Sequence, residues 1–445
     1  MRTTHGQRAD PLREKRFWEK LRSRPELLER FEAILELTEV EDGPLRTADQ
    51  IEELLVEEVR RLGNRAMQDW AGRAEERAAD ELRQGTPGVR LRKKKVLSWW
   101  CSFGAISVEE RIWRAAGCSY LRPFPARTGI SARGKSRRLE RALSDFGAEH
   151  SFRRSCQRLQ EHYGFELNAT AVRDTTLRQA ARAAAHLEAH YAPSFRVLSG
   201  TGPAYVVAEI DGTMICTLPA GRKRKESRPR EWKEMRLSAA RAQGGVETCY
   251  SAGFHTVEEA GRRWGHCTRD AGWSLGSHIH VVADGAEWIR LQSQEVFGDQ
   301  AGLLMDFYHV SEYLAAAAES CRPASPRTWL RTQQQRLRRG ATAKLLEALQ
   351  DFVEPATVSD EEAPVRAALR YLSKRLPYLN YPQALARELP IGSGLIESAH
   401  KHLLHARLKQ AGSAWLPDNA NAMAQLRVIR ANRQWEHFWQ THKAA

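Results

Sequence analysis

Two stretches that each end in an Asp-Gly pair place the strongest constraint on how this chain folds. The first covers residues 204–210 and ends at Asp211-Gly212, and the second covers residues 278–283 and ends at Asp284-Gly285. A short apolar stretch that a turn dipeptide closes is typical of a buried strand. Two such strands in one sheet would bring two carboxylates to its rim, although Asp-Gly is also a common turn after any strand.

Converging carboxylates form a hard-oxygen site that suits Mg²⁺ or Mn²⁺. The most basic loop of the chain, residues 221–230, follows the first of these stretches closely and contains Arg222, Lys223, Arg224 and Lys225. Carboxylates repel phosphate, so a basic loop beside them would attract a nucleic-acid backbone. The alternative is that this loop is only a run of charged residues exposed to solvent, without such a role.

The composition is that of a soluble globular protein. The chain has 445 residues, of which 42% are hydrophobic and 28% charged, which is enough for about three domains. No apolar run reaches the roughly 18 residues of a membrane span, and we see no signal peptide at the N-terminus. Seven cysteines at irregular spacing favour a reducing cytoplasm over a disulfide framework.

The charge balance points to a polyanion. The net charge is +14 and the pI is about 9.6, which makes nucleic acid the leading partner. An ordinary basic protein, from a genome rich in Arg codons, is the alternative that composition alone leaves open.

The first 195 residues divide into two predicted regions. Residues 1–95 show the helical spacing of apolar residues and carry no recognisable chemistry. Residues 96–195 begin with β-branched and aromatic residues on both sides of Gly104, which indicates a small pair of strands. Cys101 and Cys118 lie in that part, but neither has a partner at the two-to-four spacing of zinc modules, which disfavours structural zinc.

A helix-turn-helix is predicted at the end of this second region. Residues 151–160 form a short amphipathic helix, residues 163–165 contain a glycine break, and the helix that follows carries Arg173 and Arg178. The second helix of such a pair can enter the major groove of DNA. A plain helical hairpin is the alternative.

The remainder predicts a mixed sheet that a helical insertion interrupts. We expect the strand that ends at Asp211 to turn back as a hairpin across Asp211-Gly212, and further strands near residues 231–237, 248–254, 278–283 and 303–305. Helices on both faces complete an α/β domain made of residues 200–310 and 390–445. Residues 311–389 read as helix throughout. Beyond them, Glu397 begins a helix that also carries Lys401, Arg407 and Lys409.

Four short phrases in this order resemble one known family. They are Ile210-Asp211-Gly212-Thr213-Met214, Val281-Val282-Ala283-Asp284-Gly285, Asp306-Phe307-Tyr308-His309-Val310 and Gly392-Ser393-Gly394-Leu395-Ile396-Glu397-Ser398. Together they resemble the RNase H-like domain of bacterial insertion-sequence transposases of the Asp-Asp-Glu class. Asp306 and His309 are similar to the Asp-x-x-His feature of Mutator-like transposases. The resemblance covers about residues 200–440.

The resemblance implies a metal-dependent reaction on DNA. It assigns Asp211, Asp284 and Glu397 as the catalytic residues that bind two Mg²⁺ ions, with Mn²⁺ as a substitute. Asp306, His309 and Lys401 are expected to support that site, although a structural pairing of Asp306 with His309 is equally open. Arg407 and Lys409 join the arginines and lysines named above as predicted DNA contacts.

The predicted function is that of a transposase that cuts the ends of its element and joins them to target DNA. Double-stranded DNA is the expected partner. Synapsis of two ends implies a homodimer or larger oligomer in the bacterial cytoplasm, at the nucleoid and away from membranes. The alternatives are a structure-specific nuclease with the same fold and a DNA-binding regulator without activity.

Overall fold

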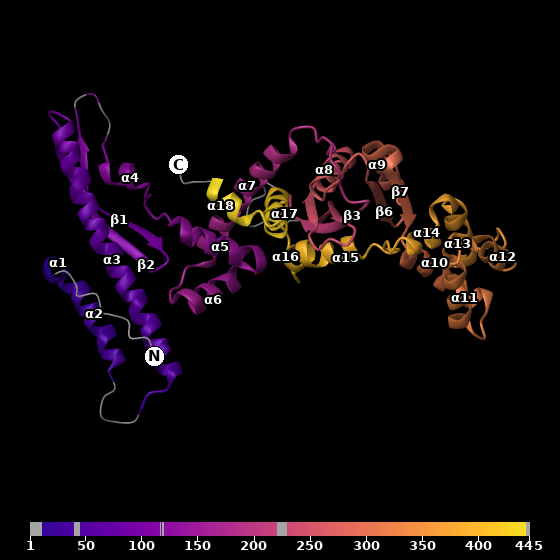
Figure 1. The fold of residues 1–445 in the computed structure, drawn as a ribbon, viewed down its shortest axis with the longest axis horizontal. Coiled ribbons are helices and arrows are strands. Elements are labelled where there is room, and N and C mark those ends of the chain that lie inside the picture. Colours follow the sequence, from indigo (N-terminus) through magenta and orange to yellow (C-terminus); the bar gives the residue numbers. More distant parts are fainter. Residues whose placement is uncertain (1–10, 40–44, 116, 118–119, 220–228, 442–445) are drawn as a thin grey trace. The chain divides into compact units, whose positions relative to one another are not determined.

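The computed structural model describes residues 11–39, 45–115, 117, 120–219 and 229–441 (Figure 1). Helix α7 (Ala169–Tyr191) contains the division between two compact units, which falls between Thr176 and Leu177. No helix in the described ranges is both long and apolar enough to cross a membrane. The predicted mixed α/β organisation, with a helical N-terminal region, is confirmed.

The first unit begins with three helices. They are α1 (Pro11–Arg22), α2 (Pro25–Thr38) and α3 (Ala48–Gly85). The long helix α3 lies within the region predicted to be helical, and Thr47 begins it with a capping box that includes Gln50. Ion pairs such as Arg24 to Asp69, at 3.1 Å, hold α2 against α3.

The predicted pair of strands is an antiparallel hairpin of β1 (Arg90–Cys101) and β2 (Gly104–Arg114). Gly104 has φ of 107°, which favours glycine at the tight turn. Residues 90–95, which end in three consecutive lysines, lie inside β1, so this strand spans the predicted boundary at residue 95. The first seven residues of β1 are all exposed, and the alternation of buried and exposed residues begins only at Leu97 and Trp99, which are buried.

Three helices around one apolar cluster follow the hairpin. After the short α4 (Pro123–Thr128) come α5 (Arg137–Glu149), α6 (Phe152–Tyr163) and the start of α7. Leu139, Leu159 and Val172, one from each of these three, are fully buried together. Gly164, in the left-handed region at φ of 69°, ends α6. The helix, turn and helix expected here are therefore present; groove binding remains a prediction.

The second unit contains a five-stranded sheet in the order β5-β4-β3-β6-β7. Its strands are β3 (Tyr205–Thr217), β4 (Glu231–Ala242), β5 (Cys249–Gly253), β6 (His278–Ala283) and β7 (Ala301–Met305). Strands β3, β4 and β5 pair antiparallel, whereas β6 and β7 run parallel to β3. Helix-containing crossovers link β5 to β6 and β6 to β7, as the sequence predicted.

The expected hairpin across Asp211-Gly212 is wrong, because β3 continues straight through this pair. Asp211 pairs with Leu237 and Gly212 with Arg236 in the middle of the β3–β4 ladder. A side chain at Gly212 would meet the carboxylate of Glu234 at 2.2 Å. Gly212 is thus an ordinary strand residue under the end of the Glu234 side chain and does not mark a turn.

The two faces of this sheet are covered differently. Helices α8 (Val257–Asp270) and α9 (Glu287–Phe297) pack on one face, where Trp264 and Ile289 lie against Val206, Ala208 and other apolar residues. The C-terminal part of the chain packs on the opposite face. The helices of this C-terminal part are α15 (Gly394–Ala399), η4 (His400–His405), α16 (Ala406–Leu408), α17 (Pro417–Ala431) and α18 (Trp435–Thr441).

The helical insertion lies beyond edge strand β7 (Figure 1). Its helices are α10 (Phe307–Cys321), α11 (Pro326–Arg338), α12 (Thr342–Gln350), α13 (Pro364–Ser373) and α14 (Tyr381–Ala386). The insertion begins at Phe307, earlier than the predicted residue 311, because Asp306 caps α10. Its core is continuous with Val207 and Leu304 of the sheet.

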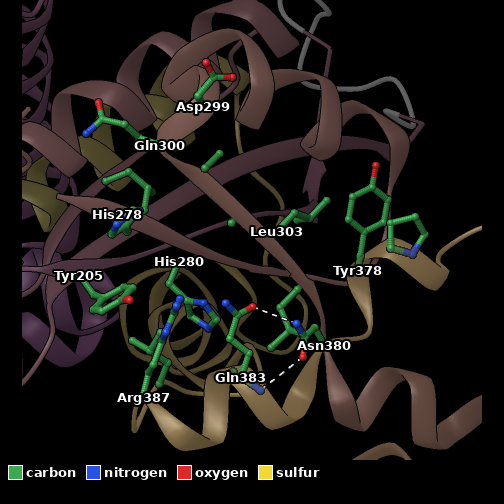
Figure 2. A pocket seen from close by; sticks show the side chains of 17 residues that line it. Tyr205, His278, His280, Asp299, Gln300, Leu303, Tyr378, Asn380, Gln383 and Arg387 are labelled. Atoms are coloured by element: carbon green, nitrogen blue, oxygen red, sulfur yellow. Dashed lines mark hydrogen bonds between the residues drawn. The ribbon is translucent and has the colours of Figure 1, made fainter. Parts of the chain in front are cut away.

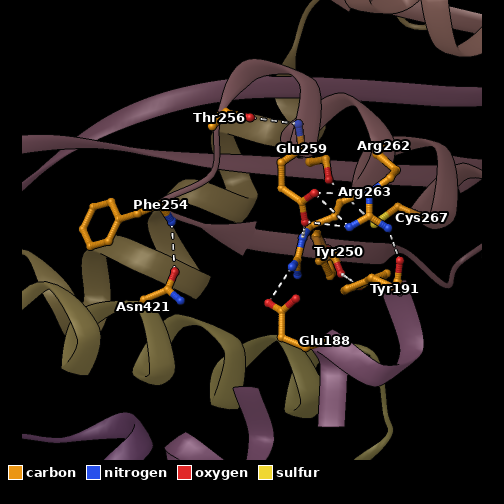
Figure 3. A network of polar contacts seen from close by, with 11 residues as sticks. Glu188, Tyr191, Tyr250, Phe254, Thr256, Glu259, Arg262, Arg263, Cys267 and Asn421 are labelled. Carbon is orange, nitrogen blue, oxygen red and sulfur yellow. Dashed lines mark hydrogen bonds and ion pairs between the residues drawn. The ribbon is translucent and has the colours of Figure 1, made fainter. Parts of the chain in front are cut away.

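A polar network fixes the second half of α7 to α8 (Figure 3). Arg263, only 2% exposed, donates to Glu188 of α7 at 2.5 Å and to Glu259 of its own helix at 2.6 Å. The Arg263 guanidinium also lies 4.9 Å from the centre of the Tyr191 ring. A buried guanidinium needs such partners, because an unpaired one would be strongly destabilising.

Candidate active site

Three aspartates form an acidic row on or directly after three adjacent strands: Asp211 lies within β3, and Asp284 and Asp306 directly follow β6 and β7. The parallel β3–β6 ladder ends with the pair of Ala208 and Val281, three residues before Asp211 and Asp284. Asp306 stands at the position of β7 that corresponds to Asp284, because Ala283 pairs with Met305 and the Asp306 N–H donates to the Ala283 carbonyl at 2.7 Å. Glu209, two residues before Asp211 and on the same face of β3, contacts Ile396 of α15, so Asp211 lies on the face that carries Glu397.

Asp211 is 43% exposed, and the imidazole of His400 lies close to it. His400 Nε2 lies 3.3 Å from Asp211 Oδ2, and the other carboxylate oxygen accepts the Gly212 N–H at 2.7 Å. Asp211 is thus held in place and remains accessible.

The helical insertion holds the loop that carries Asp284. The Tyr371 hydroxyl donates to the Asp284 carbonyl at 2.6 Å, and the Arg375 guanidinium donates to the Gly285 carbonyl at 2.8 Å. The Tyr371 ring is itself packed between Arg375 and Tyr313, at 4.0 and 4.1 Å between the group centres. The Asp284 side chain is exposed, and its Oδ1 accepts the Ala286 N–H at 2.9 Å.

The segment before Glu397 is anchored to two strands of the sheet. His280 Nε2 of β6 lies 2.7 Å from the Pro390 carbonyl, and the burial of this ring lowers the pKa of His280, which keeps it neutral. Asp306, at the end of β7, accepts the Ser393 N–H at 2.7 Å. Ser393 in turn reaches Glu397 Oε1 at 3.4 Å.

A third strand anchors the same segment through Glu209, which the sequence analysis did not single out. Glu209 is fully buried in β3, and its Oε2 accepts the Ile396 N–H at 2.7 Å. Burial raises the pKa of Glu209 to about 8, and the nearby charges of Asp306 and Glu397 act in the same direction. Glu209 is therefore neutral at pH 7. Its place in an apolar run, two residues before Asp211, was the available signal.

Asp306 and His309 have structural contacts. Asp306 is 2% exposed; its Oδ1 accepts the N–H groups of Tyr308 and His309, while Oδ2 faces Ser393. The His309 ring packs at right angles to Tyr371 at 5.8 Å, and its Nδ1 lies 3.3 Å from Glu312. These contacts favour the structural alternative for this pair.

The helix after Glu397 contains a π-helical turn at η4. Rare in proteins, π turns occur often at functional sites. Arg427 of α17 stabilises this one, because its guanidinium donates to the carbonyls of Leu403, at 2.7 Å, and of His402. The turn stacks His400 on His405, with ring centres 5.6 Å apart.

Two further residues from this helix reach β3. His405 Nε2 lies 3.0 Å from Thr213 Oγ1, and Lys409 Nζ donates to the same oxygen at 2.7 Å. One face of β3 thus contacts the C-terminal helices at three alternate residues. Glu209 contacts α15, Asp211 contacts η4, and Thr213 contacts η4 and Lys409, the residue after α16. The helical spacing of the sequence had not predicted this series of contacts.

The other described site residues that the sequence predicted lie on α7 or on the helix after Glu397. Lys401 is exposed and makes no ion pair with Glu397. Arg407 is 3% exposed and lies over the Trp415 ring at 4.7 Å, which keeps it from DNA in this conformation. Arg173 and Arg178 are exposed on α7.

Several predictions fall on residues outside the described ranges. They are the basic loop residues Arg222, Lys223, Arg224 and Lys225, and Cys118. Cys101 is described; it is a buried free thiol, and burial raises its pKa. A zinc ligand acts as the thiolate, which this environment opposes.

A cavity of about 390 Å³ lies at the opposite end of the same strands (Figure 2). Tyr205, His278 and Arg387 line it, with the Tyr205 ring stacked on His278 at 5.5 Å and covered by Arg387. None of the predicted site residues lines this cavity. The acidic row and the cavity are therefore separate features of the sheet.

The acidic side chains share a face but are not gathered around one point. Within the described ranges, no three His, Cys, Asp or Glu side chains lie close enough to hold a metal ion together. Asp211, Asp284 and Glu397 still supply only oxygen donors, the type that Mg²⁺ prefers. Comparison with protein-family models and with curated protein sequences finds no match for this chain.

Proposed function

We propose that this protein is a transposase of the Asp-Asp-Glu class, with an RNase H-like domain that cuts and joins DNA strands. One observation carries the proposal: Asp211 lies on β3, Asp284 directly follows β6, the parallel neighbour of β3, and α15, which contains Glu397, is anchored to β3 through Glu209. The mixed sheet and the interrupting helical insertion also agree with the resemblance in the sequence.

Asp211, Asp284 and Glu397 would hold the divalent cations. When bound, Mg²⁺ or Mn²⁺ lowers the pKa of an attacking water and offsets charge on the leaving oxygen of a phosphodiester. The protein's own contribution is positional. His400 fixes Asp211, Tyr371 and Arg375 fix the Asp284 loop, and Asp306 and Glu209 fix the start of α15.

DNA recognition is assigned to a different part of the chain. The helix, turn and helix of α6 and α7 present Arg173 and Arg178 at an exposed surface. With a net charge of +14, the chain is suited to a DNA backbone. Bringing two element ends together implies a homodimer or larger oligomer, which light scattering with and without end DNA would measure.

The decisive experiment is a cleavage and strand-transfer assay in Mg²⁺, on DNA that carries the element's own ends. The wild-type protein is compared with Asp284→Asn, which keeps the side-chain shape and loses its charge. Joined products from the wild type alone support a transposase. Cleavage without joining indicates a nuclease, and binding without cleavage, with host factors supplied, indicates a regulator.

A further inference from the structure

A small cluster of basic side chains lies beside Asp211. Lys409 and His405 both contact the hydroxyl of Thr213, a side chain that is only 9% exposed. Among the residues that the structure describes, no carboxylate lies within ion-pair distance of Lys409 or His405. The neighbouring His400 does contact a carboxylate, that of Asp211.

The electrostatics of this cluster favour the arrival of an anion. Burial lowers the pKa of His405, and the positive charges of Lys409, His400 and Lys401 lower it further. Burial also lowers the pKa of Lys409. A partly desolvated ammonium such as that of Lys409 is held at a cost in free energy, which a bound anion would offset.

The cluster is built by the fold and not by loose surface side chains. The π turn stacks His405 on His400, and Arg427 holds two carbonyls of that turn. Thr213 is fixed in the middle of β3, where it pairs with Met235. Both partners of the Thr213 hydroxyl are thus presented by backbone that other contacts have already ordered.

Position and donor type identify the anion as a phosphate. Lys409 offers an ammonium with three N–H donors, and Thr213 offers a hydroxyl that can turn its hydrogen toward a ligand. Thr213 lies two residues beyond Asp211 on the same face of β3, at roughly 6.6 Å along the strand. A phosphate here would be a neighbour of the one that meets Asp211.

We propose that Thr213, His405 and Lys409 form a subsite for one backbone phosphate of the DNA strand, next to the phosphate that reacts at Asp211. The inference rests on the proposed function for its ligand. It assigns Lys409 a defined contact, in place of the general DNA-binding role that the sequence suggested. The subsite would position the strand and take no part in bond breaking.

The test is DNA binding as a function of salt, measured by fluorescence anisotropy of a labelled duplex in EDTA. Lys409→Met should weaken binding and reduce the slope of log Kd against log salt by about 0.9, the value for one phosphate contact. Thr213→Val should weaken binding without changing the slope, because the lysine charge remains. Lys344→Met, an exposed lysine of α12, controls for the loss of one positive charge.

The outcomes separate this inference from the proposed function, because EDTA removes any need for metal or cleavage. A reduced slope for Lys409→Met, with Lys344→Met like the wild type, supports the subsite even if the protein never cuts DNA. A wild-type slope and affinity in Lys409→Met would overturn it even if the protein is an active transposase. Circular dichroism melting confirms that each variant is folded.

Discussion

Asp306 and Ser393 are hydrogen-bonded to each other across 87 residues of sequence, with the Ser393 N–H 2.7 Å from Asp306 Oδ2. The Ser393 hydroxyl donates to the same oxygen. Because Asp306 also caps α10, one carboxylate joins the start of the helical insertion to the segment that leads to Glu397. The segment that leads to Glu397 is therefore anchored by a residue that is only 2% exposed.

Replacing Asp306 by Asn should destabilise the protein and reduce cleavage. Asn would present an NH₂ group to the Ser393 N–H, so a buried donor would face another donor at a cost of about 2 kcal/mol. Urea unfolding measures the loss of stability. Asp299→Asn, an exposed substitution, is the control, and equal midpoints for the two variants would show that Asp306 is not an anchor.

Neutralising the predicted metal ligands should stop the reaction without preventing DNA binding. Asp211→Asn, Asp284→Asn and Glu397→Gln each remove a charge that would hold a divalent cation, while the DNA contacts of α7 stay unchanged. Cleavage assays and electrophoretic mobility shifts measure the two properties separately. Any one variant that still cuts at the wild-type rate removes that residue from the proposed triad.

Arg427→Met should disturb the π turn. The carbonyls of His402 and Leu403 would lose their buried donors, and we expect a loss of about 2 kcal/mol in the free energy of unfolding. His405 and Lys409 would then no longer be held at Thr213, so the salt slope of DNA binding should fall as in Lys409→Met. A destabilised variant that keeps the wild-type slope would separate the turn from the phosphate subsite.

His266 should make the protein less stable in acid. It is fully buried among Tyr191 and Phe195, its ring nitrogens have no partner, and burial lowers its pKa to about 4. Between pH 6.5 and 4 the unfolded chain gains a proton that the folded chain does not. Stability is therefore present above pH 6.5 and is lost as the pH falls.

The substitution His266→Phe keeps an aromatic ring in this site and removes the titration. Denaturant unfolding at several pH values should show that the variant's advantage over the wild type grows as the pH falls from 6.5 to 4. The growth is at most about 1.4 kcal/mol for each pH unit. If the difference in unfolding free energy between the two proteins stays constant across this range, His266 takes up its proton equally in the folded and the unfolded chain.

The spacing of apolar residues, and the glycines and prolines between the apolar stretches, predicted most elements of the sheet and the helices around it. The strand predicted at 278–283 agrees with the structure because it is a buried, strongly patterned segment. Asp211-Gly212 misled because the same dipeptide that commonly forms a turn lies here inside a strand, paired with Leu237 and Arg236.

The parts of the site that sequence could not reveal depend on contacts between distant residues. Glu209 looked like one polar residue in an apolar run until the Ile396 N–H was found beside it. The roles of His400, His405 and Lys409 depend on a π turn that Arg427 stabilises from another helix. The spacing of residues within 397–409 does not predict this turn, because the donor, Arg427, lies outside that segment.

The insertion enters and leaves the sheet at one place. Its first residue, Phe307, donates its N–H to the carbonyl of Ile391, at 2.8 Å, where the chain returns. Residues added to or removed from α11 and α12, which do not hold the Asp284 loop, would leave these anchors in place. The number of residues between Asp284 and Glu397 is consequently a poor criterion for finding this kind of site in other chains. The hydrogen bonds that join the two ends of the insertion, from Phe307 to Ile391 and from Ser393 to Asp306, are a better one.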